Sequence, residues 1–397
     1  MISTYLDWAA TAPPDPEALD YGRKVALEYF GNPSSLHFYG KKAAELLAES
    51  RNKIAELLNC KPEQIYFTSG GSESNSIVFS QLFLKLRKGS ILIGATEHPS
   101  VWETARLYAE LGYPVQEAKP EKDGRISPAA ALHAFSSETE LVSIMLLNNE
   151  TGIVQDVKSI AEALRNARRG KKPPHIHTDA VQALGKEKID LEDLGVDSAS
   201  FSGHKIGAPR GIGILYLRRP VQGLFKGGGQ EKGVRPGTEN LPGIAALARV
   251  MEKRLPFIEE HREQARRQKA RLMEGLSEIP GALFIPEQAV EKTLGEDSHV
   301  SPFILKCSFP PVPGEVLQRV LSDRGYAVST GSACSSSADR GRKKEKINRV
   351  LKVLGVSPQA AESSIRISLG PGTRDEEIEA FVETAKREIG TIKEQLG

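Results

Sequence analysis

Residues 175–205 read HIHTDAVQALGKEKIDLEDLGVDSASFSGHK, and the fold class depends most on this stretch. It contains two short runs typical of buried strands, His175–Thr178 and Ser198–Ser202. Asp179 directly follows the first run, and Lys205 closely follows the second. The two residues are 26 positions apart (205 − 179), which corresponds to one helix-plus-strand excursion. We therefore expect two consecutive strands to present both side chains at one site.

Strands and helices are predicted to alternate from about residue 40 to residue 220. Several strand-like runs are nearly continuous in apolar residues, as in parallel strands that are buried on both faces. The other predicted strands are Gln64–Thr68, Ser90–Ala95, Leu141–Leu147 and Gly211–Leu217, and the predicted helices include Lys41–Leu58 and Val157–Ala167. This pattern predicts an α/β fold with a mostly parallel sheet flanked by helices.

The pattern changes after residue 255. The long charged helical stretch Pro242–Ile279 contains Pro256, so we expect a break near Leu255. Beyond it, the predicted strands are Phe303–Phe309 and Ile365–Leu369, and the predicted helices are Gly314–Arg324 and Asp375–Gln395. These elements predict a smaller α+β domain. We expect residues 16–255 to form the large domain, and residues 1–15 with 256–397 to form the small one.

The composition excludes several classes of protein. A chain of 397 residues is too long for one compact core, and 39% hydrophobic with 26% charged residues is typical of globular proteins. The net charge of +2 argues against a dedicated binder of nucleic acids or membranes. The three cysteines include no CxxC pair and cannot form a disulfide framework, so we expect no metal site and a reducing compartment. The sequence shows no secretory signal or membrane span, and we expect a cytoplasmic protein.

Three motifs at predicted strand ends indicate the chemistry. Residues 69–74 (SGGSES) suit an anion at a helix amino terminus, residues 177–182 (HTDAVQ) place an acid at a strand end, and residues 200–205 (SFSGHK) surround a lysine with small residues. Taken singly, they also fit a glycine turn, a helix-capping aspartate and a surface lysine. Together they supply a phosphate cradle, an acid for a pyridinium nitrogen and a lysine for a Schiff base. Those are the parts that a pyridoxal phosphate enzyme needs.

The sequence resembles the cysteine desulfurases of the NifS/IscS type, within the class V aminotransferase-like superfamily. The matching stretches run nearly from end to end and include residues 5–7, 9–11, 30–33, 67–70, 96–98, 148–150, 202–205 (SGHK), 235–238, 331–334 (GSAC) and 364–370. The resemblance implies the fold type I of aminotransferases, with a large domain that binds pyridoxal 5'-phosphate. It also implies a homodimer.

The resemblance assigns roles to individual residues. It implies that Lys205 holds the cofactor and moves the substrate Cα proton, that Asp179 keeps the pyridine nitrogen protonated, and that His98 stacks on the ring and takes part in proton transfer. The other implied cofactor contacts are Gly71, Ser72, Gln182, Ser202, His204 and, from the second subunit, Thr238. Arg366 would bind the substrate carboxylate, supported by Asn32 and Asn149.

Cys334 determines which reaction is expected. Its neighbours are small and polar, which predicts an exposed loop, whereas Cys307 lies in a strand-like run and Cys60 at a helix end. The resemblance implies that L-cysteine is converted to L-alanine, with sulfur held as a persulfide on Cys334. The sulfur would then pass to an acceptor protein, such as an iron–sulfur scaffold or a tRNA-thiolation protein.

Departures from the family pattern leave alternatives open. Gly71-Ser72 replaces the usual Ala-Thr, and residues 339–346 add a basic segment that is either a solvated linker or a docking surface for an acidic acceptor. The chain also stops soon after Gln395, which leaves delivery to an iron–sulfur scaffold open. The competing functions are a selenocysteine lyase or a class V aminotransferase on the same fold. More distant alternatives are a nonenzymatic binding protein and a nucleic-acid binder that uses residues 340–346.

Overall fold

The computed structural model describes residues 3–84, 88–287, 299–330 and 348–396. Cys334 and the basic segment 339–346 lie outside the described residues, so the predictions made for them stay predictions. No helix in the described ranges is long and apolar enough to cross a lipid bilayer.

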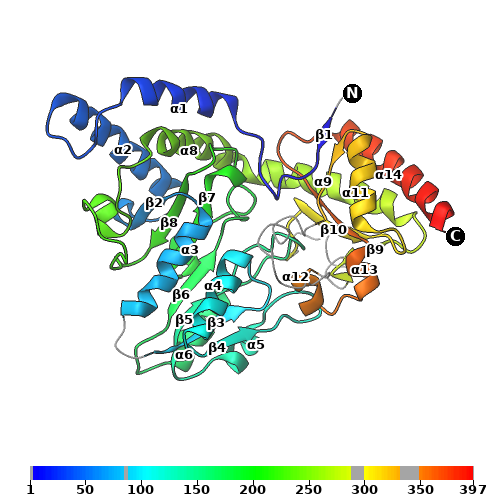
Figure 1. The fold of residues 1–397 in the computed structure, drawn as a ribbon, viewed down its shortest axis with the longest axis horizontal. Helices are drawn as coiled ribbons and strands as arrows, with labels where there is room; N and C mark the ends of the chain where they lie inside the picture. The colour runs from blue at the N-terminus through cyan, green and yellow to red at the C-terminus, as the bar shows by residue number, and fades with distance from the viewer. Residues whose placement is uncertain (1–2, 85–87, 288–298, 331–347, 397) are drawn as a thin grey trace.

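A seven-stranded sheet forms the larger part of the molecule (Figure 1). Its spatial order is β2 (Ile65–Thr68), β8 (Gly213–Leu217), β7 (Ser198–Ser202), β6 (His175–Asp179), β5 (Thr139–Ser143), β3 (Ser90–Gly94) and β4 (Val115–Ala118). Strand β8 runs antiparallel to both of its neighbours, and the other pairs are parallel. Residues 203–212, which join β7 to β8, are too few for the crossover that a parallel pair needs. The predicted mostly parallel sheet is confirmed.

Helices cover both faces of this sheet (Figure 1). They are α1 (Pro16–Glu28), α2 (Phe38–Leu57), α3 (Gly71–Ser80), α4 (Pro99–Glu110), α5 (Pro128–Ala134), α6 (Val157–Ala167), α7 (Leu191–Leu194) and α8 (Leu241–Arg254). Successive residues of β2 belong to different apolar clusters: Ile65 and Phe67 pack with α2 and α8, whereas Tyr66 packs with α3 and α4. Both faces are therefore buried, which explains the nearly continuous apolar runs.

Two details of the sheet differ from the prediction. Strand β5 ends at Ser143 rather than Leu147, although the backbone N–H groups of Ile144 and Leu146 still donate to His177 (3.1 Å) and Asp179 (2.9 Å) of β6. Strand β4 was not predicted from the sequence. Its side chains are mostly half-buried or exposed at the sheet edge, so it lacks the apolar run of an inner strand.

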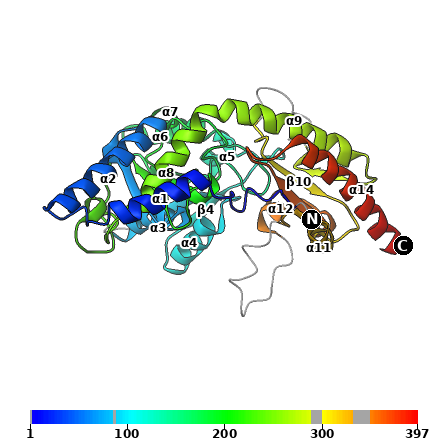
Figure 2. The same ribbon diagram turned by 90° about the horizontal axis from the view of Figure 1, so that it is seen from above.

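A second, antiparallel sheet follows the break at Pro256. Helix α8 passes through a 3-10 turn, Leu255–Phe257, into α9 (Ile258–Ser277), so the predicted break is confirmed. Strand β10 lies between β9 and β12, and α9 and α14 lie side by side over them (Figures 1 and 2). The remaining elements are β1 (Thr4–Tyr5), β9 (Leu283–Ile285), β10 (Ile304–Ser308), α11 (Gly314–Asp323), β11 (Tyr326–Ala327), α12 (Arg349–Val353), α13 (Pro358–Glu362), β12 (Ser364–Ser368) and α14 (Asp375–Leu396).

Candidate active site

The chemical groups predicted from the sequence gather at one edge of the large sheet. Parallel strands β6 and β7 are neighbours, and Asp179 ends β6 while Lys205 lies in the 3-10 turn just after β7. In open α/β sheets this carboxyl edge is where ligands bind. The topology therefore places both residues at the same edge of the sheet, and their joint action on one cofactor stays a prediction.

Asp179 is buried and held by two donors. Its Oδ1 accepts the backbone N–H of Val181 (3.0 Å), and its Oδ2 accepts the side-chain amide of Asn75 on α3 (2.9 Å). Only 4% of the residue is exposed to solvent. A buried carboxylate is stable when hydrogen bonds compensate its desolvation, and one that is held this firmly can pair with a cationic N–H.

The amine of Lys205 is hydrogen-bonded to the chain segment between β1 and α1. Its Nζ donates to the carbonyl oxygens of Ala9 (2.7 Å) and Ala10 (2.8 Å). Gln182 also donates to the Ala9 carbonyl (2.7 Å), and its own Oε1 is buried without a hydrogen-bond partner among the described residues. The first residues of the chain therefore form one wall of the site.

The start of α3 provides the anion-binding end. Gly70 has φ +156°, and a Cβ built there would lie 3.5 Å from the Ser202 hydroxyl. A Cβ built on Gly71 would lie 2.4 Å from Cγ2 of Val181, which follows Asp179 closely. The backbone thus approaches β6 and β7 without intervening side chains, and the first N–H groups of the helix are available to an anion. Ser72 follows on the exposed side of the same turn.

His204 lies at the same end of the site. Its Nδ1 lies 3.1 Å from the hydroxyl of Thr11. Burial, reinforced by the charge of Lys205, lowers the pKa of His204 to about 4. His204 is therefore neutral near pH 7 and can contact a phosphate as a hydrogen-bond donor rather than as a cation.

His98 caps the amino terminus of α4. The backbone N–H of Ser100 donates to its Nδ1 (3.1 Å), and the Ser100 hydroxyl lies 2.9 Å from the same nitrogen. Burial lowers the pKa of His98, and so does the charge of Lys205, whereas Asp179 and Glu150 act in the opposite direction. His98 is therefore within electrostatic reach of both Asp179 and Lys205.

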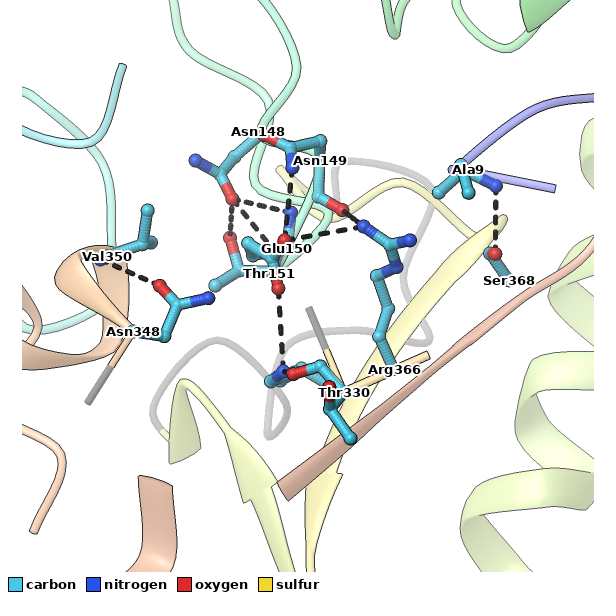
Figure 3. A network of polar contacts seen from close by, with 12 residues as sticks. Ala9, Asn148, Asn149, Glu150, Thr151, Thr330, Asn348, Val350, Arg366 and Ser368 are labelled. Atoms are coloured by element: carbon cyan, nitrogen blue, oxygen red, sulfur yellow. Dashed lines mark hydrogen bonds and ion pairs between the residues drawn. The ribbon is translucent and has the colours of Figure 1, made fainter. Parts of the chain in front are cut away.

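A second polar cluster surrounds Arg366 on β12 (Figure 3). Its guanidinium donates to Asp7 Oδ1 (2.8 Å), to the carbonyl oxygen of Asn149 (2.8 Å) and to Glu150 Oε1 (3.4 Å). Lys306, which pairs with Arg366 across β10 and β12, lies 3.4 Å from Glu150 Oε2 and donates to the Thr330 carbonyl (2.9 Å). Two cations and two carboxylates thus lie together next to Thr330.

Two residues that were expected to act with this site lie elsewhere in the single chain. Asn32 was expected to support Arg366, but it lies in the exposed turn between α1 and α2, where its Oδ1 accepts the N–H of Ser34 (2.9 Å). Thr238 is exposed in the segment before α8, and its assignment to a second subunit is not tested by one chain. The structure does bring Asn149 to Arg366, through the backbone carbonyl of Asn149.

Several site residues were not predicted from the sequence. Asp7 and Glu150 form ion pairs with Arg366, and Glu150 also pairs with Lys306. Asn75 donates to Asp179. A signal for Asn75 exists in the sequence, because it is a polar residue shortly before the apolar run Ile77-Val78-Phe79. The ion pairs join segments more than 150 positions apart and leave no local pattern.

The residues present fit pyridoxal phosphate. The buried Asp179 carboxylate suits a pyridinium N–H, the primary amine of Lys205 lies one strand away, and the glycine turn before α3 leaves room for a phosphate. The buried Oε1 of Gln182 is a polar atom that a ring hydroxyl can satisfy.

Comparison with known proteins defines the class. The family model described as Aminotransferase class-V matches residues 4–381, so the chain belongs to this family. The fold is accordingly that of the fold type I aminotransferases, as predicted.

Within the class V aminotransferase family, the chain is similar to proteins named cysteine desulfurase or NifS-like. The chain is 36% identical to the cysteine desulfurase IscS of Shewanella pealeana, over 99% of this chain and 94% of the relative. Among solved structures, a NifS-like protein is 31% identical with a TM-score of 0.87, covering 98% of this chain and 100% of that protein. A structure titled SspA in complex with cysteine is 28% identical with a TM-score of 0.78, covering 93% of this chain and 99% of that protein.

Proposed function

We propose that the protein is a pyridoxal phosphate-dependent cysteine desulfurase, which converts L-cysteine to L-alanine and holds the sulfur as a persulfide on Cys334. The observation on which this proposal chiefly depends is the position of Asp179 and Lys205 at neighbouring strand ends, beside the glycine turn of α3. Similarity to relatives named cysteine desulfurase supports the choice of reaction.

The chain's own residues have distinct tasks in this proposal. Bound pyridoxal phosphate supplies an electron sink that stabilises negative charge at the substrate Cα. Asp179 holds the proton on the pyridine nitrogen, and Lys205 holds the cofactor and then takes the Cα proton of the substrate. Ser202, Ser72, His204 and the N–H of Gly71 hold the phosphate, and Gln182 contacts the ring hydroxyl.

The substrate carboxylate binds Arg366. In the structure this guanidinium already contacts Asp7 and Glu150, so it is held in a fixed orientation before substrate arrives. Lys306 pairs with Glu150, so the two cations (Arg366 and Lys306) balance the two carboxylates (Asp7 and Glu150). An incoming carboxylate would replace Asp7 or Glu150 as an acceptor of the buried guanidinium.

Sulfur transfer is assigned to Cys334. The Cys334 thiolate attacks the sulfur of the substrate, a new S–S bond forms, and the C–S bond of the substrate breaks, so that the carbon skeleton leaves as alanine. The two described cysteines are poor candidates, because burial raises the pKa values of both Cys60 and Cys307 to about 12. A thiol held in that state supplies almost no thiolate near pH 7.

We also propose a homodimer in the cytoplasm, with Thr238 reaching the phosphate of the other subunit. An exposed aromatic and aliphatic group on the α1–α2 turn supports a subunit contact: Phe30 is 66% exposed, Leu36 88% and Phe38 72%. The sulfur acceptor remains a protein of iron–sulfur assembly or tRNA thiolation in this proposal.

The test is a turnover assay of the pure protein. Loaded with pyridoxal phosphate and given L-cysteine and a thiol reductant, the wild type is expected to release alanine and sulfide in equal amounts. Cys334→Ala is expected to abolish both products, while Cys60→Ala, a control thiol on the same chain, leaves both within about twofold.

The assay also separates the competing functions. Keto acid formation by Cys334→Ala at the wild-type rate would identify an aminotransferase, which needs no thiol. Elemental selenium release from L-selenocysteine without sulfide release from L-cysteine would identify a selenocysteine lyase.

A further inference from the structure

A chain of buried hydrogen bonds connects Asp179 to His98 through Asn75. Asn75 lies on α3 and is 0% exposed. Its side-chain amide donates to Asp179 Oδ2 (2.9 Å) and to the hydroxyl of Ser100 (2.9 Å), and its Oδ1 faces His177 Nε2 (2.9 Å). Each polar atom of the Asn75 side chain is therefore engaged with another residue.

The orientation of the Asn75 amide follows from its neighbours. If the amide were reversed, its oxygen would face the carboxylate oxygen of Asp179, which is an acceptor–acceptor contact. With the observed orientation, His177 must have its proton on Nε2, and its Nδ1 accepts the hydroxyl of Ser198 (2.8 Å). Burial lowers the pKa of His177 to about 3, so this imidazole stays neutral and keeps its direction.

The same logic continues from Asn75 to His98. Since the Asn75 amide donates to the Ser100 oxygen, the Ser100 hydroxyl proton is directed to His98 Nδ1. The backbone N–H of Ser100 also donates to Nδ1, so this nitrogen receives two donors and is unprotonated. The proton of neutral His98 is then on Nε2. The charged groups that face His98 are Asp179, Lys205 and Glu150.

We propose that Asn75 is a positioning residue that fixes two groups of the active site at once. It holds Asp179 Oδ2 for the pyridinium N–H, and it keeps the Ser100 hydroxyl a donor, so that His98 remains a neutral imidazole with its proton on Nε2. His98 then offers the substrate an N–H donor and not a base, and abstraction of the Cα proton is left to Lys205. This inference rests on the proposed function of the site.

The first measurement is made on the wild-type enzyme. In the cofactor-loaded enzyme labelled with ¹⁵N-histidine, the His98 signals are assigned with His98→Gln and recorded at pH 7. The expected result is a pyridine-type shift at Nδ1 and a pyrrole-type shift at Nε2. A pyrrole-type shift at Nδ1 would overturn the proposal.

Variants then test the two arms separately. Asn75→Ala is expected to raise the protonated or Nδ1–H fraction of His98 and to weaken pyridoxal phosphate binding roughly tenfold, since it removes a hydrogen bond to a charged acceptor. Ser100→Ala is expected to change His98 in the same direction but to leave cofactor affinity within about twofold. Asn52→Ala, at an exposed position on α2, is the control and is expected to change neither.

A second substitution covers the case in which Asn75→Ala does not fold. Asn75→Asp conserves the shape but places a carboxylate beside Asp179, where two like charges cannot both ionise, so the absorption band of the protonated cofactor is expected to weaken. Unchanged His98 shifts, cofactor affinity and absorption in the Asn75 variants would overturn the proposal. Failure of the proposed function is distinguishable, because wild-type protein would then bind the cofactor with the predicted His98 shifts yet release no alanine from L-cysteine.

Discussion

Gly71 begins α3 at a point where no side chain fits. The sequence shows glycine there in place of the alanine usual for the family, and the structure supplies the reason. An added Cβ would lie 2.4 Å from Cγ2 of Val181, a β-branched residue with little freedom to rotate. Gly71 and Val181 are thus a matched pair in direct contact, where α3 begins against the segment after β6.

Gly71→Ala is expected to destabilise the protein by about 1–3 kcal/mol, as overpacking does. In the Val181→Ala background the clashing methyl is gone. Adding Gly71→Ala there is therefore expected to lower the stability much less than Gly71→Ala does in the wild type. Gly390→Ala is the control: this helical glycine is exposed and has no atom within 4 Å of the added Cβ, so a gain of about 0.5–1 kcal/mol is expected. Chemical unfolding measures all four, and equal effects at both glycines would contradict the account.

At this scale, the sequence predicted the residues whose chemistry is local. Asp179, Lys205 and the glycine turn follow strand-like runs directly, so strand ends and small residues sufficed to select them. Asn75, Glu150 and Lys306 were missed because their roles consist of contacts with distant segments. Asn32 was expected to support Arg366. The residues around Asn32 carry no signal of how far the α1–α2 turn lies from Arg366 in the folded chain.

Among the elements, α12 contacts the loop that holds His98. Arg349, its first residue, donates to the carbonyl oxygens of Ala95 (2.5 Å) and Glu97 (2.7 Å), and its guanidinium lies 4.6 Å from the ring centre of Trp102. Burial and the charge of Asp179 raise the pKa of Glu97 well above its usual range. Arg349 binds this loop through its backbone carbonyl groups, whereas the Glu97 carboxyl accepts the backbone N–H of Met145.

Arg349→Met is expected to loosen this loop, because two buried carbonyl groups lose their donors. Hydrogen exchange of the peptide that contains residues 95–98 should become at least roughly tenfold faster, corresponding to about 1.4 kcal/mol. Arg106→Met is the control, since Arg106 also lies over Trp102 (5.2 Å) but pairs with glutamates of its own helix. Similar exchange in both variants would contradict a specific role for Arg349.

Elements were predicted best where both faces of the sheet are buried. The inner strands β6 and β7 were found nearly to the residue, because their apolar runs are continuous. Strand β4 at the edge was missed, because its side chains are mostly half-buried or exposed, and β5 ends earlier than predicted, at Ser143. The break at Pro256 was predicted from proline geometry alone.

For the whole molecule, we propose that residues 16–255 form one domain and residues 1–15 with 256–397 the other. Two separate apolar clusters agree with this division, one around the seven-stranded sheet and one between β10 and α14. The segment from β1 to α1 crosses between them and contacts both Lys205 and Arg366, through Ala9 and Asp7 respectively. The active site would then lie where the two domains meet.

The proposed homodimer gives a prediction at the same scale. Phe38→Glu places a charge in the exposed aromatic group of the α1–α2 turn and is expected to yield monomers in light scattering. Cofactor affinity should fall as well, because Thr238 would no longer reach the second subunit. Leu132→Glu, at a 39% exposed residue of α5, is the control and should remain dimeric. A monomeric wild type with full activity would contradict the homodimer.

The central claim, sulfur held on Cys334, is tested most directly by peptide mass spectrometry after a single turnover. The loaded enzyme is mixed with one equivalent of L-cysteine without reductant, quenched by alkylation and digested. The account predicts that the peptide containing Cys334 gains the mass of one sulfur atom in proportion to the alanine formed, while the Cys60 and Cys307 peptides do not. Alanine formation with an unmodified Cys334 peptide would contradict the account.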